Sequence, residues 1–353
     1  MEKIMLYENL KNLGLNKIIT IEALSVLFVV FLLSVLATRL ILPVLRARKL
    51  NQPINMYVLE HASKSGTPTM GGICFILASL LSMLLWIFLE YSGKLGNFGG
   101  FESGELIPVA LTFCFAAANG LIGFIDDYKK LIKKQNEGLN EKQKMILQVV
   151  FAAGYIAMMA ITDNLRTSLH IPFTSFDLEL GWVAYPFYLL VIVGFVNSTN
   201  ITDGIDGLAS SIGVTVGASL LVFSIATASR YTAVASATLV GALLGFLVFN
   251  RFPAKVFMGD TGSLYIGALI MGCAISEGEL ISVIIMSLVF IWEMMTSLLQ
   301  RLYYKLSGGK RLFKKAPIHH HYQLLGWSEV KIVLVFAIIS LVFCAIGLAG
   351  ALI

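Results

Sequence analysis

Long apolar runs, separated by short polar stretches, limit this chain to one kind of fold. A run of about 20 apolar residues is long enough for a helix to cross a bilayer. Only 13% of the 353 residues are charged, roughly half the usual share of soluble domains, which argues against a large soluble core. The sequence therefore predicts an all-α polytopic integral membrane protein with a single transmembrane domain over residues 1–353. The expected helices, about ten, cover 20–45, 71–90, 106–125, 145–161, 182–199, 208–227, 233–250, 263–275, 280–302 and 331–353.

Basic residues are distributed unequally between the two sets of predicted loops. The loops after odd-numbered spans, with Arg301 at the end of the ninth, hold 18 lysines and arginines, and the other loops hold three. Basic loops stay in the cytoplasm, so we expect the first set there and both termini outside. Loop 162–181 is expected to form a small hairpin. The eighth run is short and the ninth long, which favours a tilt or a break there.

Two kinds of polar residue lie within the apolar runs. The four cysteines are interpreted as packing residues, and they show no spacing typical of a disulfide or zinc framework. Glu293 lies within the ninth run. A carboxylate at that depth is either functional or satisfied by packing, and the sequence leaves both alternatives open.

Carboxylates gather in the loops of the predicted cytoplasmic face. Asp126 and Asp127 end the third span, Asp203 and Asp206 join the fifth to the sixth, and Asp260 precedes the eighth. A carboxylate at the bilayer centre costs roughly 2.5–3.5 kcal/mol, so these residues should line water or a polar cavity. Adjacent helical residues point about 100° apart, so Asp126 and Asp127 are expected to differ in role. Alternatively, this pair only ends the span, and Asp260 only caps its helix.

Groups suited to phosphate lie on the same face. The segment 64–72 combines a lysine, hydroxyls and glycines that can hold a phosphate, or it is a turn capped by Thr69. The lysines between 129 and 144 suit a substrate or anionic headgroups. Three consecutive histidines, 319–321, suit a phosphorylated substrate better than zinc, because no Cys or HExxH spacing accompanies them. Together these groups indicate Mg²⁺-assisted phosphoryl transfer; the alternative, an anionic-solute transporter, would place ionisable groups near the midplane.

Five motifs, in order between about Lys64 and Trp327, resemble the polyprenyl-phosphate N-acetylhexosamine-1-phosphate transferases. They are GTPTMGG (66–72), the DDYxK-type stretch (126–130), NxTDGxDGLA (200–209), FMGDxGS (257–263) and APIHHHY (316–322). GTPTMGG and PIHHH are similar to the branch that acts on phospho-N-acetylmuramoyl-pentapeptide. The resemblance implies transfer from UDP-N-acetylmuramoyl-pentapeptide to undecaprenyl phosphate, giving lipid I and UMP, at the cytoplasmic membrane of a bacterium during peptidoglycan synthesis. A sibling that transfers N-acetylglucosamine-1-phosphate is the alternative, and the histidine triplet argues against it.

The same resemblance implies a role for individual residues. Asp126 would be the base that deprotonates the lipid phosphate, Asp127 would support metal or phosphate, and Asp260 would bind Mg²⁺, the implied cofactor. A covalent aspartyl-phosphate route stays open as the alternative. His319 is also placed in the catalytic set, at the diphosphate or sugar. The residues implied to bind substrate are Lys64, Thr69, Lys130, Lys134, Lys142, Asn200, Asp203, Asp206, Asn250, Phe257, Gln300, His320 and His321. The family also implies a homodimer in contact with membrane lipid and no nucleic-acid partner.

Overall fold

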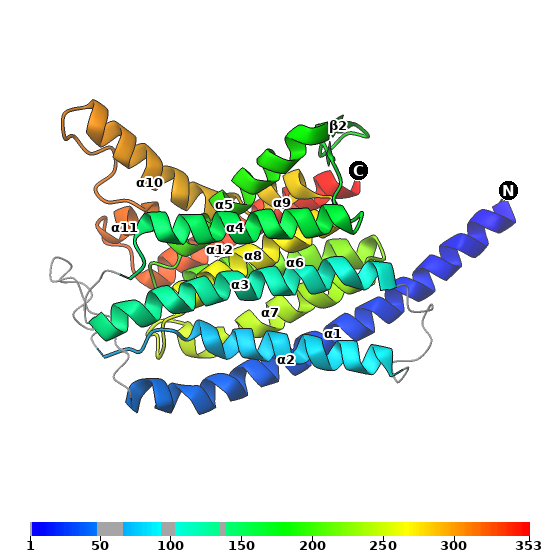
Figure 1. Ribbon diagram of the computed structural model, residues 1–353, viewed down its shortest axis with the longest axis horizontal. Helices are drawn as coiled ribbons and strands as arrows, with labels where there is room; N and C mark the ends of the chain where they lie inside the picture. Colours follow the sequence, from blue (N-terminus) through cyan, green and yellow to red (C-terminus); the bar gives the residue numbers. More distant parts are fainter. Residues whose placement is uncertain (1, 48–65, 93–102, 134–137) are drawn as a thin grey trace.

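The computed structural model describes the whole chain except residues 1, 48–65, 93–102 and 134–137, and it is a bundle of roughly parallel and antiparallel helices (Figure 1). Within the described residues, two short strands and one 3-10 turn complete it. In chain order the elements are α1 (Glu2–Ala47), α2 (Gly72–Tyr91), α3 (Ser103–Lys133), α4 (Glu141–Ile161), β1 (Ser168–His170), β2 (Asp177–Glu179), η2 (Gly181–Val183), α5 (Ala184–Thr202), α6 (Leu208–Ala226), α7 (Arg230–Asn250), α8 (Gly259–Glu277), α9 (Leu280–Met286), α10 (Leu288–Leu306), α11 (Ile318–Gln323) and α12 (Glu329–Leu352).

The structure has helix over each of the ten predicted spans, but in the part of the chain that it describes fewer helices qualify as membrane spans by length and composition. Eight helices there are long and apolar enough to cross a membrane, and a ninth is added if the bent pair α9 and α10 counts as one span. The predicted eighth span, α8, is not among them, because its first turn is polar. The break expected in the ninth run is confirmed, since α9 and α10 meet at an angle of 74°.

Helix α8 lies at the centre of the bundle. Every side chain from Thr261 to Ile275 is buried, and α3, α5, α2 and α7 surround the helix (Figure 1). Glycine allows the closest of these approaches, because a Cβ at Gly123 of α3 would collide with the backbone carbonyl of Asp260. The first turn of α8 is therefore held tightly against the end of α3.

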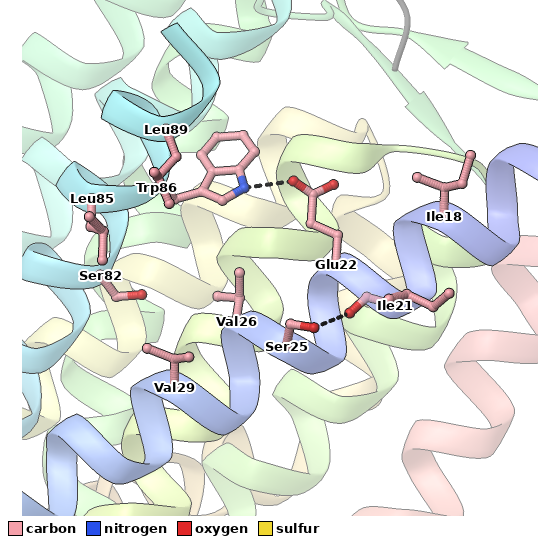
Figure 2. A pocket seen from close by; sticks show the side chains of 10 residues that line it. All are labelled: Ile18, Ile21, Glu22, Ser25, Val26, Val29, Ser82, Leu85, Trp86 and Leu89. Carbon is pink, nitrogen blue, oxygen red and sulfur yellow. Dashed lines mark hydrogen bonds between the residues drawn. The ribbon is translucent and has the colours of Figure 1, made fainter. Parts of the chain in front are cut away.

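The opposite end of the bundle carries the predicted hairpin and a separate apolar cavity. Strands β1 and β2 pair antiparallel within loop 162–181, which confirms the hairpin. Between α1 and α2 lies a cavity of about 400 Å³, lined mainly by aliphatic side chains (Figure 2). At its polar edge Trp86 donates to Glu22 at 2.8 Å, and Arg230 pairs with Glu22 and Glu90 at 2.6 and 2.7 Å. These charges fasten α1, α2 and α7 together.

Candidate functional site

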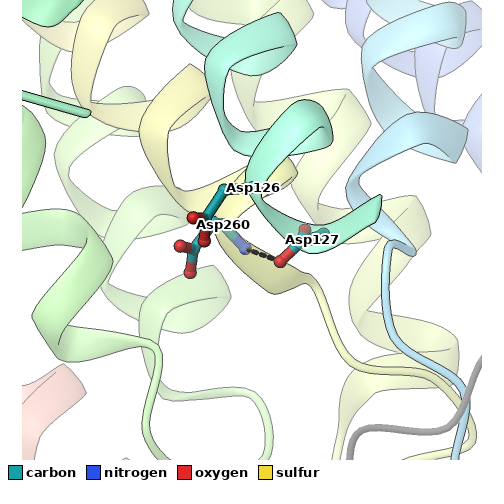
Figure 3. A group of neighbouring side chains, drawn as sticks. All are labelled: Asp126, Asp127 and Asp260. Atoms are coloured by element: carbon teal, nitrogen blue, oxygen red, sulfur yellow. Dashed lines mark hydrogen bonds between the residues drawn. The ribbon is translucent and has the colours of Figure 1, made fainter. Parts of the chain in front are cut away.

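Three carboxylates from two distant parts of the sequence meet where α3 ends and α8 begins. Asp126 and Asp127 lie on the last turns of α3, and Asp260 lies in the first turn of α8. Oxygens of all three lie within 4.8 Å of one another (Figure 3). Asp126 and Asp127 are buried, whereas Asp260 is partly exposed. The site therefore has a buried floor and one carboxylate nearer the surface.

Asp127 caps α8 from the neighbouring helix. Its Oδ1 accepts the N–H of Asp260 at 3.2 Å (Figure 3). Its Oδ2 accepts the N–H and the hydroxyl of Thr261 at 3.0 and 2.7 Å. The first amides of a helix lack partners within the helix and favour a negative charge. The alternative that Asp260 caps its own helix is therefore wrong: the N-cap position is Met258, which makes no side-chain cap, and Asp127 supplies the acceptors.

The carboxylate of Asp260 faces three other helices. Lys144 of α4 and Lys130 of α3 approach its Oδ2 at 2.8 and 3.2 Å. Asn200 of α5 donates to its Oδ1 at 2.9 Å and also to the hydroxyl of Ser263 at 2.9 Å. Four helices thus converge on one carboxylate.

Asp126 has different partners from Asp127, as the 100° between adjacent residues leads us to expect. Its Oδ1 accepts the N–H of Leu139 at 2.7 Å, and its Oδ2 pairs with Lys130 at 2.6 Å. Leu139 directly precedes Asn140, which caps α4. Asp126 therefore joins the end of α3 to the start of α4.

Lys144 belongs to the site although it was not among the residues implied to bind substrate, and Lys142, which was among them, takes no part in the cluster. Asn140 and Gln143 form a capping box that starts α4 at Glu141. In a helix started there, residues 142 and 144 point about 200° apart, so Lys142 is exposed while Lys144 reaches Asp260 and, at 3.1 Å, Asn200. The available signal was Gln148, a polar residue one turn after Lys144 in an otherwise apolar run.

Polar groups in the connection from α5 to α6 contact other parts of the chain. Burial of the Asp203 carboxyl, followed by the charges of Asp260, Asp127 and Asp206, raises its pKa to about 8, although the N–H of Gly259 donates to it. Asp206 is buried, and its carboxylate accepts the N–H of Ala254 at 2.8 Å. Its own N–H donates to Glu329 of α12 at 3.2 Å.

Asn250 is also occupied by protein groups. It is buried at the end of α7, accepts the hydroxyl of Ser210 at 2.9 Å and donates to the carbonyl of Val256 at 3.0 Å. Its side chain therefore fixes the start of the connection between α7 and α8. Substrate contacts of Asp206 and Asn250 stay predictions.

The histidine triplet divides between the interior and the surface. His319 is fully buried, and its Nδ1 lies 2.8 Å from an oxygen of Glu293, which is also fully buried. His320 is half-buried beside Gln323 at 2.7 Å, and His321 accepts the N–H of Lys314 at 3.1 Å. One oxygen of Glu293 is thus paired with the triplet itself, whereas its Oε1 is buried and has no hydrogen-bond partner among the described residues.

The remaining expected residues lie before α2, before α8 and on α10. The N–H of Phe257 donates to the carbonyl of Pro68 at 2.8 Å, which ties the segment before α2 to the segment before α8. Thr69 is buried there, but α2 has no side-chain cap, so the capping alternative for Thr69 is wrong. Gln300 accepts the N–H groups of Leu312 and Phe313 at 3.0 and 2.9 Å. Two further expected residues, Lys64 and Lys134, lie outside the described residues.

The acidic cluster fits a divalent metal ion. Three carboxylates face two ammonium groups, which leaves negative charge without a counter-ion among the described side chains. Carboxylate oxygens are the ligands that Mg²⁺ prefers. Asp260 is the most exposed of the three carboxylates and is therefore the best placed to bind a metal.

Comparisons with known proteins identify relatives of the chain. The model of glycosyl transferase family 4 matches residues 109–278, and the phospho-N-acetylmuramoyl-pentapeptide-transferase signature 1 matches residues 64–76. The phospho-N-acetylmuramoyl-pentapeptide-transferase of Listeria monocytogenes is 39% identical over 331 residues, which cover 93% of this chain and 96% of the relative. The proteins of the same name from Halalkalibacterium halodurans and Clostridium perfringens are 38% and 37% identical, over 92% and 95% of this chain and 96% and 99% of theirs.

Proposed function

The chain belongs to the phospho-N-acetylmuramoyl-pentapeptide-transferases of glycosyl transferase family 4, and we propose that their reaction takes place at its buried acidic cluster. As a member it is a multi-pass enzyme of the bacterial cytoplasmic membrane that acts in peptidoglycan synthesis. It transfers phospho-N-acetylmuramoyl-pentapeptide from the UDP-linked precursor to undecaprenyl phosphate, giving lipid I and UMP. The observation that carries the proposal is the convergence of Asp126, Asp127 and Asp260 with two lysines.

Asp260 would hold Mg²⁺. Asp260 is the most exposed of the three carboxylates, and its oxygens contact Lys144 and Asn200 rather than the first turn of α8. When bound, Mg²⁺ supplies positive charge that stabilises the diphosphate oxygens of the donor.

Asp126 is proposed as the base. An oxygen of the lipid phosphate attacks the phosphorus that carries the sugar, the bond from that phosphorus to the UMP oxygen breaks, and the proton of the lipid phosphate passes to Asp126. Leu139 and Lys130 hold the Asp126 carboxylate in place for this step. Proton transfer by a positioned carboxylate is a common source of rate enhancement.

Lys130 and Lys144 would neutralise the phosphates. Their ammonium groups lie beside Asp260, so they face the same space as the carboxylates. Preorganised positive charge of this kind stabilises the charge that develops on a transferring phosphoryl group. Asn200 and Asp203, on the connection that follows α5, would contact the nucleotide or sugar of the donor.

We further propose that the acidic cluster faces the cytoplasm and that the enzyme is a homodimer. The distribution of lysine and arginine supports this orientation. A cysteine at Lys310, in the connection between α10 and α11, should resist a membrane-impermeant thiol reagent in intact cells, whereas one at Ser92, directly after α2, should react. The reverse labelling pattern would show that the acidic cluster lies on the outer face of the membrane. Crosslinking in native membranes tests the dimer, which the family resemblance alone supports.

The experiment that tests the proposed site combines purified enzyme, undecaprenyl phosphate and UDP-N-acetylmuramoyl-pentapeptide, with and without Mg²⁺. We expect Asp126→Asn to release UMP at least about 100-fold more slowly while it still binds the UDP-linked substrate. Asp163→Asn, at an exposed turn beyond α4, is the matched control and should behave as wild type. Wild-type turnover in Asp126→Asn would show that Asp126 is not the base. A phosphorylated enzyme trapped with the UDP-linked substrate alone would establish the covalent route.

A further inference from the structure

Glu293 and His319 form a pair in the interior that the catalytic proposal does not use. Both side chains are fully buried, and Oε2 of Glu293 lies 2.8 Å from Nδ1 of His319. Burying a carboxylate in a membrane protein is costly unless a partner satisfies it. Oε2 of Glu293 has such a partner in His319, and this contact links α10 to α11.

The backbone of α11 is fastened to α10 beside this pair. The N–H of Ile318 donates to the hydroxyl of Thr296 at 3.2 Å, and that hydroxyl donates to the carbonyl of Glu293 at 2.9 Å. The position of His319 is thus determined by α10. Oε2 of Glu293 can accept a hydrogen bond from the Nδ1 edge of the His319 ring at this distance. The orientation of the imidazole ring is then set by Glu293.

The other edge of the ring lies against the connection between α5 and α6. Nε2 of His319 is buried and has no hydrogen-bond partner in the described part of the chain. A methyl group on Gly204 would collide with this nitrogen, so the ring occupies the space that a side chain at position 204 would fill. The imidazole ring of His319 therefore packs directly against the backbone of Gly204.

The residue before Gly204 connects this contact to the acidic cluster. Asp203 accepts the N–H of Gly259, the first residue of α8. The next residue of α8, Asp260, is the proposed metal ligand. Contacts therefore run without a gap from Glu293 through His319, Gly204 and Asp203 to the first turn of α8.

We propose that Glu293 is a positioning residue for the donor site. It orients His319 so that the ring supports Gly204 and sets the place of Asp203 beside the first turn of α8. His319 then acts through this connection rather than by touching the reacting atoms. The inference rests on the proposed role of Asn200 and Asp203 in binding the donor, and its test separates the two.

The test compares Glu293→Leu, which cannot accept from His319, with Glu293→Gln, whose amide oxygen can. Amide hydrogen exchange of residues 201–205 reports the connection directly, and the KM values for the UDP-linked donor and for undecaprenyl phosphate report function. In Glu293→Leu we expect exchange and donor KM to rise about tenfold, the factor expected from one hydrogen bond, with the acceptor KM unchanged. Glu293→Gln should stay within about threefold of wild type, since most of that bond is retained.

Glu277→Gln is the matched control. It alters a carboxylate at the far end of α8 that accepts hydroxyls of Ser224 and Ser229 at 3.1 and 2.9 Å, and it should leave exchange in residues 201–205 unchanged. Gly204→Ala approaches the same contact from the other side and should raise that exchange even if Glu293→Leu does not fold.

Wild-type exchange in folded Glu293→Leu or in Gly204→Ala would overturn the proposal. So would exchange in Glu293→Gln as fast as in Glu293→Leu, because the hydrogen bond would then not be what orients the ring. Raised exchange with an unchanged donor KM would support the role of Glu293 and count against the donor role of the connection.

Discussion

Replacing Asp127 with asparagine tests whether this residue is a helix cap or a metal ligand. The carboxylate accepts three hydrogen bonds from the first turn of α8, at 3.2, 3.0 and 2.7 Å. Asparagine has one oxygen, so its amide group must face an N–H or hydroxyl that also donates. The negative charge at the start of α8 is lost as well. We therefore expect Asp127→Asn to destabilise the protein even when no metal is present.

The size of the effect follows from these contacts. A lost hydrogen bond to a charged group costs about 1.5–3 kcal/mol, and a lost charge at a helix N-terminus costs about 0.3–1 kcal/mol more. The expected loss in the free energy of unfolding is thus about 2–4 kcal/mol. Thr261→Val removes only the hydroxyl that donates to Asp127 at 2.7 Å, so it should cost less, about 1–2 kcal/mol.

Unfolding of the detergent-solubilised variants, followed by tryptophan fluorescence in EDTA and again in excess Mg²⁺, measures these losses. The order should be Asp127→Asn, then Thr261→Val, then wild type, and Mg²⁺ should not close the gap. If Asp127→Asn unfolds like wild type but needs more Mg²⁺ for turnover, Asp127 is a metal ligand and the cap contributes little.

Three further predictions concern the other groups of the site. Asp260→Asn should slow turnover by at least about 100-fold, the scale of one lost preorganised charge, and near-normal UMP release across a Mg²⁺ titration would remove Asp260 from the metal site. Lys144→Met should lose clearly more turnover than Lys142→Met, because only Lys144 contacts Asp260; equal losses would contradict the geometry. In metal-free enzyme Asp203 keeps its proton until the pH rises through about 8, whereas an unfolded aspartate ionises near pH ~4. Stability should therefore fall as the pH rises from about 4 to about 8, and the melting temperature of Asp203→Asn should fall less between pH 6 and pH 8; identical slopes would exclude Asp203 as the cause.

The sequence by itself determined the class of fold and the chemistry. Apolar runs of about 20 residues leave the backbone no alternative to helix within lipid, and most predicted spans became helices for that reason. Helix α8 also forms where the eighth span was predicted, and its polar first turn, which precedes that span, belongs to the site. Motif residues such as Asp126 and Asp260 were found in advance because carboxylates at the ends of apolar runs need a chemical explanation.

Only the tertiary structure decided which polar groups meet and what each one binds. Lys144 rather than Lys142 reaches Asp260, because the cap at Asn140 sets the phase of α4, and a shift of two residues turns a side chain by about 200°. Likewise the partner of Glu293 lies 26 residues away, beyond a change of direction between α10 and α11. Contacts of this kind depend on how helices pack side by side. The periodicity of one run of sequence predicts a helix but not which other helix packs against it.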